Sequence, residues 1–182
     1  MPNHCDNDLR IKGKSADIQK FFEFALNKKK DKDVKAVEDK IGIRDRRYGE
    51  IDVNAFIPYP KKYADVDAQA EEARKNPNAD WSKIKDGYNH GGYDWCIENW
   101  GTKWGLYDFS PVKEFKSSAV VSFQTAWSPA LPVIQKMSEM FPELSFTLKY
   151  FECGGGFKGV YECKAGKVLK NETSKYKGNR GG

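Results

Sequence analysis

Residues 118–150, SAVVSFQTAWSPALPVIQKMSEMFPELSFTLKY, carry the pattern from which we derive the fold. Ser118 to Gln124 has the β-branched and aromatic content of a strand. Ser128-Pro129 marks a helix start, because proline suits the first helical position. An apolar stripe at helical spacing follows and ends at Pro142. Leu144 to Tyr150 then alternates apolar and polar residues, so this stretch predicts a strand, a helix and a second strand.

The N-terminal part shows the same kinds of pattern. Residues 7–13 alternate polar and apolar side chains and end at a glycine, as a half-buried strand does. A helix capped by Ser15 follows, with apolar residues along one side. Ile51 to Ile57 alternates again before Pro58, which cannot donate to a strand ladder, so we expect another strand there.

Residues 61–89 differ in character from the rest of the chain. Ala64 to Lys75 is rich in alanine and glutamate and short of large apolar groups, so we expect a helix with little to bury. Asp80 is placed to cap a short helix from Trp81 to Ile84. We interpret this region as part of an insertion that lies over the domain.

The predicted order is strand, helix, strand, insertion, strand, helix, strand, and a hairpin from Phe157 to Cys163 and Gly166 to Leu169. Two such β-α-β units predict an α+β fold with an antiparallel sheet and both helices on one face, the ferredoxin-like split arrangement. We therefore predict one domain over residues 1–170, with a helical and loop insertion over about 58–112 and an appended C-terminal hairpin. Residues 171–182 are predicted as a flexible basic tail.

Composition limits the classes of function. The 182 residues are 39% hydrophobic and 14% aromatic, which indicates a packed core. The net charge of +5 supports an anionic partner only weakly. No apolar run approaches the roughly 20 residues that span a bilayer, and residues 1–10 lack a signal-peptide core, so we expect a cytoplasmic protein without a membrane partner. The four cysteines form no Cys-x-x-Cys pair, so we expect free thiols, no metal site and no cofactor.

Residues 93–105, YDWCIENWGTKWG, pack three of the five tryptophans into a short stretch. Two interpretations stay open. The tryptophans either attach the insertion to the sheet, or line a site where aromatic faces stack on a planar group and polar side chains bond its edges. On the second interpretation, the ligand-binding residues are Trp95, Glu98, Asn99, Trp100, Thr102, Lys103, Trp104 and Trp127.

Other motifs are less specific. Arg44, Arg46 and Arg47 lie close together and form a candidate anion site, because arginine makes bidentate bonds to phosphate and carboxylate. The lysine run from Lys28 to Lys32 is either a solvated helix end or a phosphate-binding tip. The glycine-rich residues 154–159 lack the ending of a P-loop and predict a hairpin turn. No serine or cysteine sits in a nucleophile motif, so we assign no catalytic residue.

Several short blocks resemble a known family when taken in order. They are MPNHC at 1–5, Phe56-Ile57-Pro58, residues 93–104, FQTAWSP at 123–129, FPEL at 141–144 and GFKG at 156–159. Together they resemble the YubB-type ferredoxin-like family of small proteins from phages, plasmids and other mobile elements, over almost the whole chain. The resemblance implies a ferredoxin-like fold and a mobile-element setting, without a general activity. His4 stands where that family usually has tryptophan, so no role carries over to it.

Three classes of function follow. The setting implied by the resemblance predicts a non-enzymatic phage or mobile-element accessory protein in the host cytoplasm. It would counteract host defence by binding or sequestering a nucleotide-like anionic ligand or a defence protein. The alternatives are a nucleic-acid-binding accessory protein and a small nucleotide-processing enzyme, and a homo-oligomer is compatible with each. Against nucleic acid, the predicted strands lack the basic and aromatic alternation of RNA-recognition sheets.

Overall fold

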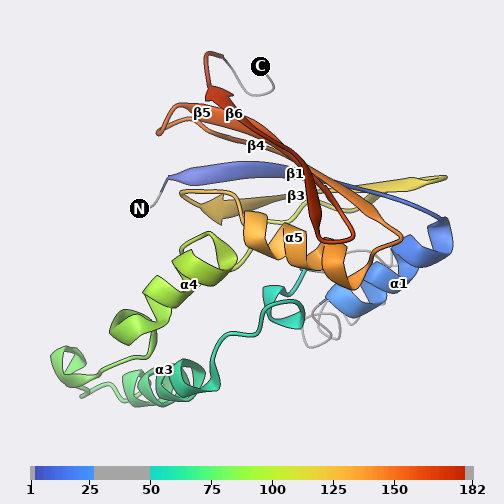
Figure 1. Ribbon diagram of the computed structural model, residues 1–182. Coiled ribbons are helices and arrows are strands. Elements are labelled where there is room, and N and C mark those ends of the chain that lie inside the picture. Colours follow the sequence, from blue (N-terminus) through green and yellow to red (C-terminus); the bar gives the residue numbers. More distant parts are fainter. Residues whose placement is uncertain (1–2, 27–49, 179–182) are drawn as a thin grey trace, which may run out of the picture.

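A sheet of six antiparallel strands forms one layer of the structure, and helices lie against one of its faces (Figure 1). The computed structural model describes residues 3–26 and 50–178. The strands run in the order β2-β3-β1-β4-β5-β6 across the sheet. Their bounds are β1 His4–Lys12, β2 Lys113–Phe115, β3 Ser118–Ala126, β4 Ser145–Glu152, β5 Phe157–Lys164 and β6 Lys167–Lys175.

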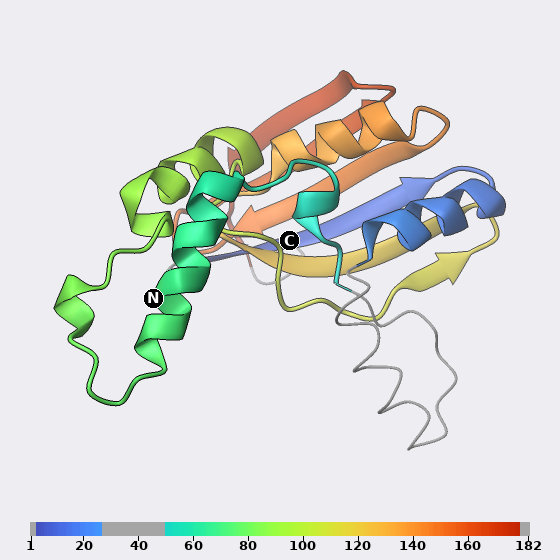
Figure 2. The same cartoon turned by 90° about the horizontal axis from the view of Figure 1, so that it is seen from below.

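The first four strands with two helices form the predicted ferredoxin-like arrangement. Helix α1 (Ser15–Ala25) follows β1, and α5 (Leu131–Met140) connects β3 to β4. Both helices cover the same face of the sheet (Figure 2). The hairpin of β5 and β6 extends the sheet beyond β4, as the sequence predicted.

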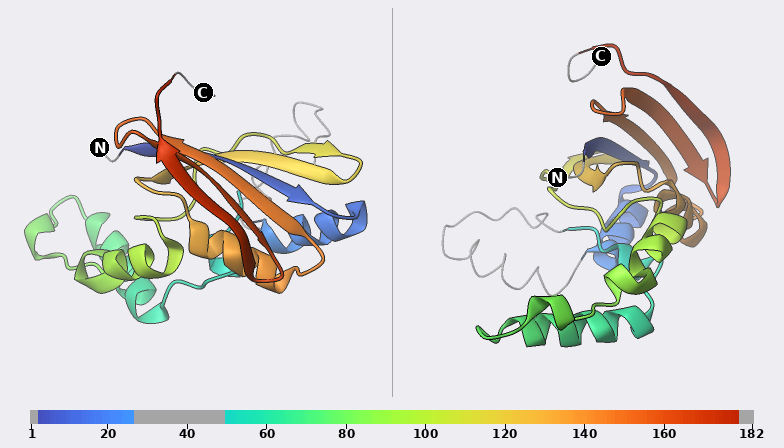
Figure 3. Two further views of the ribbon diagram at one scale, coloured as in Figure 1. Left: turned by 45° about the horizontal axis from the view of Figure 1, so that its top comes forward. Right: turned by 90° about the vertical axis from the view of Figure 1, so that its left-hand side faces the viewer.

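A large segment separates α1 from β2. Its described elements are a 3-10 turn at Val53–Ala55, α3 (Lys61–Arg74), a 3-10 turn at Trp81–Lys83, a π-helical turn at Tyr88–Gly92, and α4 (Tyr93–Trp100). Helices α3 and α4 extend past the sheet, toward the end where β1 begins (Figure 3). Ala70 is the buried residue of α3, which agrees with the prediction of a helix with little to bury.

The core lies between the sheet and the helices. Along β1 the side chains alternate, so that Leu9 and Ile11 are buried while the intervening residues face the other side. Leu9 pairs with Val121 on β3 and with Leu148 on β4. Each such buried aliphatic side chain contributes about 1.5–3 kcal/mol relative to exposure. The alternation therefore fixes which face of the sheet is left open.

The predicted strand from Ile51 to Ile57 is wrong. Only Ile51 makes a β-bridge, to Leu26, and residues 53–55 form a 3-10 turn. The second strand of the ferredoxin-like unit is instead β2, whose three residues are all exposed and carry no burial pattern. The segment between α1 and β2 therefore includes residues 50–57, ahead of the predicted insertion boundary at 58.

Two further boundaries differ from the prediction. Helix α5 begins at Leu131 rather than at Ser128-Pro129, and the proline of its first turn is Pro132. Strand β6 continues to Lys175, so residues 171–175 pair with β5 instead of fraying. The arginines at 44, 46 and 47 and the lysine run at 28–32 lie outside the described residues. Over residues 3–26 and 50–178, no helix is long and apolar enough to cross a bilayer.

The four cysteines are free, and they differ in accessibility. Cys5, Cys96 and Cys163 are buried, whereas Cys153 is exposed. Burial raises the pKa of Cys5 to about 12 and that of Cys96 to about 11. Since the thiolate is the reactive form, these two thiols should react slowly near neutral pH.

We predict that a thiol-reactive dye labels one cysteine rapidly in the native protein and four after denaturation. The rapid reaction should disappear in Cys153→Ser, because Cys153 is the exposed thiol. Labelling is followed by mass spectrometry at about pH 8, below the raised pKa values. A disulfide that persists in denaturant, or rapid labelling of Cys5, would contradict this assignment.

Candidate functional site

The loop after α4 is fastened to the end of β3. Helix α4 ends at Gly101, whose φ of +75° suits glycine and where a Cβ would come within 2.8 Å of Pro132 Cδ. The buried Thr102 hydroxyl donates to the carbonyl of Ala126, at 2.9 Å. The Ser128 hydroxyl donates to the carbonyl of Gly101, at 2.7 Å. These bonds fix the loop between β3 and the start of α5.

Lys103, the next residue of this loop, is surrounded by aromatic rings. Its Nζ lies 4.7 Å from the ring centroid of Trp127, 5.1 Å from that of Trp104 and 5.9 Å from that of Tyr93. Within the described residues, no carboxylate forms an ion pair with Lys103. Each cation–π contact contributes about 0.5–1 kcal/mol, and more where water is excluded. We call Tyr93, Lys103, Trp104 and Trp127 the Lys103 cluster.

Trp127 has an unusual backbone conformation for so large a residue. Its φ is +72°, in the left-handed region, and its side chain remains 39% exposed. The conformation costs about 1 kcal/mol for a residue with a Cβ. The N–H of Trp127 donates to the carbonyl of Asn3, at 2.9 Å, and its ring meets that of Tyr93 edge to face. Strain of this kind gathers at functional sites more often than elsewhere.

Aromatic contacts continue from the Lys103 cluster to the sheet. Trp104 lies 6.3 Å from Tyr107, centroid to centroid, and the Tyr107 hydroxyl is hydrogen-bonded to Nδ1 of His4 at 2.8 Å. Burial raises the pKa of Tyr107, so its hydroxyl stays protonated. Burial also raises the pKa of Tyr88 to about 12, and its hydroxyl donates to the carbonyl of Lys103. The hydrogen bond from Tyr88 therefore holds the backbone of Lys103.

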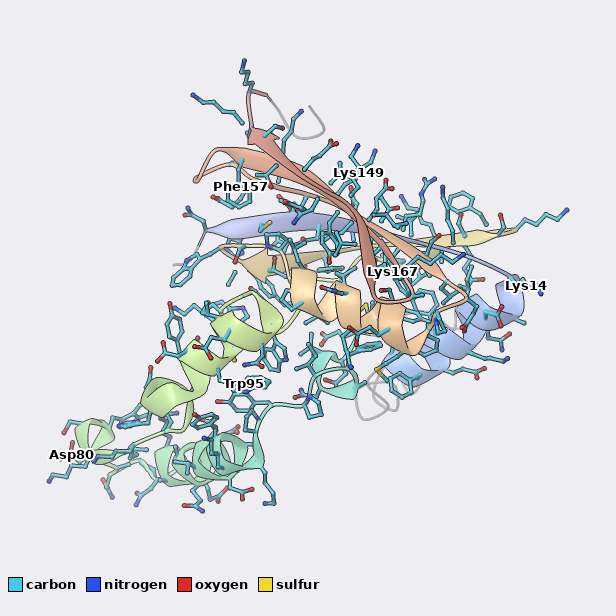
Figure 4. All side chains as sticks on the ribbon, in the orientation of Figure 1. Lys14, Asp80, Trp95, Lys149, Phe157 and Lys167 are labelled. Carbon is cyan, nitrogen blue, oxygen red and sulfur yellow. The ribbon has the colours of Figure 1, made fainter. Side chains whose placement is uncertain are left out.

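Two other tryptophans of the Trp-rich stretch pack the insertion onto the domain. Trp100 is buried, and its indole N–H donates to the carbonyl of Ile57, at 2.8 Å. The Trp95 side chain lies beside α4, on the side of α3 (Figure 4). It packs edge to face on Trp100 and on Tyr59. The Trp100–Ile57 hydrogen bond and the Trp95–Tyr59 contact join α4 to the segment leading to α3, whereas the Trp95–Trp100 contact lies within α4. The packing interpretation therefore fits Trp95 and Trp100, and the ligand-site interpretation stays a prediction for Trp104.

Two further predicted ligand residues, Glu98 and Asn99, lie on α4. Glu98 is exposed on α4, and the Asn99 amide donates to the carbonyl of Trp95 within its own helix. Of the eight predicted residues, the structure brings together Lys103, Trp104 and Trp127. Sequence reasoning missed Tyr93, the first residue of the Trp-rich stretch, and Tyr107, two residues after its end.

A hollow of about 180 Å³ lies elsewhere, against Trp100. It is lined by residues 50–54, Trp100, Gly105 and Leu106, and holds none of the Lys103 cluster. In the part of the chain that the structure describes, no group of three or more His, Cys, Asp or Glu side chains is arranged to hold a metal ion. The Lys103 cluster is therefore the site on which we base the functional argument.

The sheet order and the two helices on one face define a ferredoxin-like α+β protein. Residues 99–178 match a family model described as a ferredoxin-like domain in Api92-like protein. The crystal structure of protein api92 from Yersinia pseudotuberculosis is similar, with a TM-score of 0.52 and 11% sequence identity. The similarity covers 99% of this chain and 100% of that one, and at this identity it concerns the fold alone. None of the curated proteins matches the chain.

We predict that the free energy of unfolding of Trp127→Gly is about 1 kcal/mol higher than that of Trp127→Ala, because glycine adopts the left-handed conformation without strain. Both variants should fold, since the side chain is 39% exposed. Thermal and urea unfolding measure the difference. As a comparison, Trp100→Ala should lose about 3–5 kcal/mol, because it empties a buried position. If Trp100→Ala and Trp127→Ala lower the free energy of unfolding equally, both tryptophans are core residues.

Proposed function

We propose that this protein is a non-enzymatic binding protein that sequesters a nucleotide-like anionic ligand at the Lys103 cluster. The observation that carries the proposal is the Lys103 ammonium, which lies among three aromatic rings without a carboxylate partner in the described residues. The rings attract the cation but do not neutralise it. An anion would supply the missing charge.

The aromatic members of the cluster suit the planar part of such a ligand. Trp127 and Trp104 are both partly exposed, so a ring face can receive a base. Stacking of a base on an aromatic side chain contributes about 1–3 kcal/mol, whatever the base. A phosphate next to the ammonium would form a charge-assisted hydrogen bond, which is about twice as strong as a neutral one. The strained backbone of Trp127 supports this role, because the strain places its ring beside Lys103.

Binding without chemistry is the simpler function for this cluster. Its four side chains include no carboxylate, thiol or imidazole to act as a general base or nucleophile. His4 is connected to the cluster through Tyr107, which contacts Trp104, and its ring nitrogen is hydrogen-bonded to the Tyr107 hydroxyl. The resemblance to the YubB-type family supports a setting in a phage or other mobile element. In that setting the ligand would be a nucleotide-like signal of the host's defence, captured in the host cytoplasm.

We predict that Lys103→Met weakens nucleotide binding about tenfold or more, because it keeps the length of the side chain and removes its charge. Calorimetry with each common ribonucleoside triphosphate, and with a cyclic dinucleotide, measures the affinity. The matched control is Lys61→Met on α3, whose lysine is 84% exposed and away from the cluster. Thermal melting should change little in Lys61→Met, whereas Lys103→Met loses its cation–π contacts and should melt at a lower temperature while staying folded in the binding assay.

Native mass spectrometry of the protein purified from host cells provides an independent test. The wild type should retain a small anionic ligand that Lys103→Met loses. The proposal is wrong if no nucleotide binds and no ligand is retained, or if Lys103→Met binds as tightly as the wild type.

A further inference from the structure

The face of the sheet opposite α1 and α5 is not covered by any described helix (Figures 1 and 3). The register shows which residues lie on it, because side chains alternate along each strand. Asp6, Asp8, Arg10 and Lys12 of β1 face this side, and their cross-strand partners share it. We call this surface the open face.

One end of the open face carries a stacked pair of aromatic rings. Phe151 of β4 and Tyr176, just after β6, lie 5.4 Å apart with an interplanar angle of 11°. Both are partly exposed, and the N–H of Tyr176 donates to the carbonyl of Gly156 at 2.8 Å, which holds it beside the β4-β5 turn. A stacked and exposed pair of this kind offers a flat surface to another planar group.

A third aromatic ring lies on the same row of the sheet. Phe151 pairs with Asp6, Asp6 pairs with Gln124, and Gln124 pairs with Tyr107. Three interstrand steps of about 4.8 Å place Tyr107 roughly 14 Å from Phe151. Tyr107 also contacts Trp104 of the Lys103 cluster. Aromatic side chains thus mark a line across this end of the open face.

The charges on the open face favour an anionic partner. Its acidic residues are Asp6, Asp8, Glu162 and Glu172. Glu172 pairs with Lys170 at 3.1 Å, whereas Asp6 and Asp8 accept hydrogen bonds from the neutral side chains of Gln124 and Ser122, which do not neutralise a carboxylate. Several basic residues on this face form no ion pair within the described chain. They are Arg10, Lys12, Lys149, Lys158 and Lys164.

Lysines beside the aromatic pair give the surface its most specific feature. Lys158 lies directly across from Phe151 on β5, and Lys149 is two residues before Phe151 on β4. Lys149 is exposed and projects from the open face (Figure 4). Phosphates spaced along a strand can meet these ammonium groups while neighbouring bases stack on Phe151 and Tyr176.

We propose that the open face binds a single-stranded nucleic acid, with bases on the Phe151–Tyr176 pair and on Tyr107 and phosphates at Lys149, Lys158 and Arg10. A single strand fits better than a duplex, because paired bases are stacked on each other and cannot stack on a protein ring. The proposal goes beyond sequestration of a small ligand, since it uses residues outside the Lys103 cluster. Sequence patterns did not show this surface because Phe151, Tyr176 and Tyr107 come from three separate segments.

The test is fluorescence anisotropy with a labelled oligothymidylate of about 15 nucleotides, with oligouridylate and duplex DNA as comparisons. Lys149→Ala combined with Lys158→Ala should weaken binding and reduce the salt slope by about 1.4, since each phosphate contact to a single strand contributes about 0.7. Phe151→Ala should weaken binding roughly tenfold by loss of stacking, and Tyr176→Ala should do so too.

The controls separate this proposal from the proposed function. Lys61→Met should leave oligonucleotide binding unchanged, and the open-face variants should keep the mononucleotide affinity that Lys103→Met loses. Melting temperatures close to that of the wild type will show that each open-face variant remains folded. Absence of oligonucleotide binding, tighter binding of the duplex, or wild-type affinity in all open-face variants would each overturn the proposal, and the first outcome would leave the open face to a protein partner.

Discussion

The buried hydrogen bond from the Thr102 hydroxyl to the Ala126 carbonyl is the contact on which the site depends. Thr102 is fully buried, so loss of this bond would leave an unsatisfied polar group at a cost of about 1–3 kcal/mol. The bond joins the loop after α4 to the last residue of β3. It thereby places Lys103, which follows Thr102, next to Trp127, which follows Ala126. One structural contact thus positions both halves of the Lys103 cluster.

The tryptophans of this region lie in two kinds of environment, and geometry separates them. Trp95 and Trp100 pack against each other and against Tyr59, and the indole N–H of Trp100 is satisfied by a backbone carbonyl. Trp104 and Trp127 instead leave ring surface exposed beside a cation. A buried ring stabilises the fold by the area that it removes from water, whereas an exposed ring keeps that area for a ligand. Composition alone could not distinguish these uses.

The elements with strong periodicity were predictable from the sequence. The alternation in β1 and β4 and the apolar stripe of α1 directly reflect which side chains are buried. The segment from 51 to 57 was mispredicted because its apolar residues alternate and Ile51 and Val53, two positions apart, are both buried, as in a strand. The next buried side chain, Phe56, follows Val53 by three positions, directly after the 3-10 turn. Of the Lys103 cluster, Lys103, Trp104 and Trp127 were predicted from the sequence as ligand-binding residues, whereas Tyr93 was not. The left-handed backbone of Trp127 and the approach of β3 to the loop depend on tertiary contacts, which no local pattern records.

The central claim is that two tryptophans line a ligand site while two others are core. The most direct measurement is ¹⁹F NMR of protein labelled with 5-fluorotryptophan, with resonances assigned by single Trp→Phe variants and titrated with a mixture of the common ribonucleoside triphosphates. The account predicts that the resonances of Trp104 and Trp127 shift on binding, while those of Trp81, Trp95 and Trp100 stay in place. Shifts confined to Trp95 and Trp100, or no shift at Trp104 and Trp127 under saturating nucleotide, would contradict it.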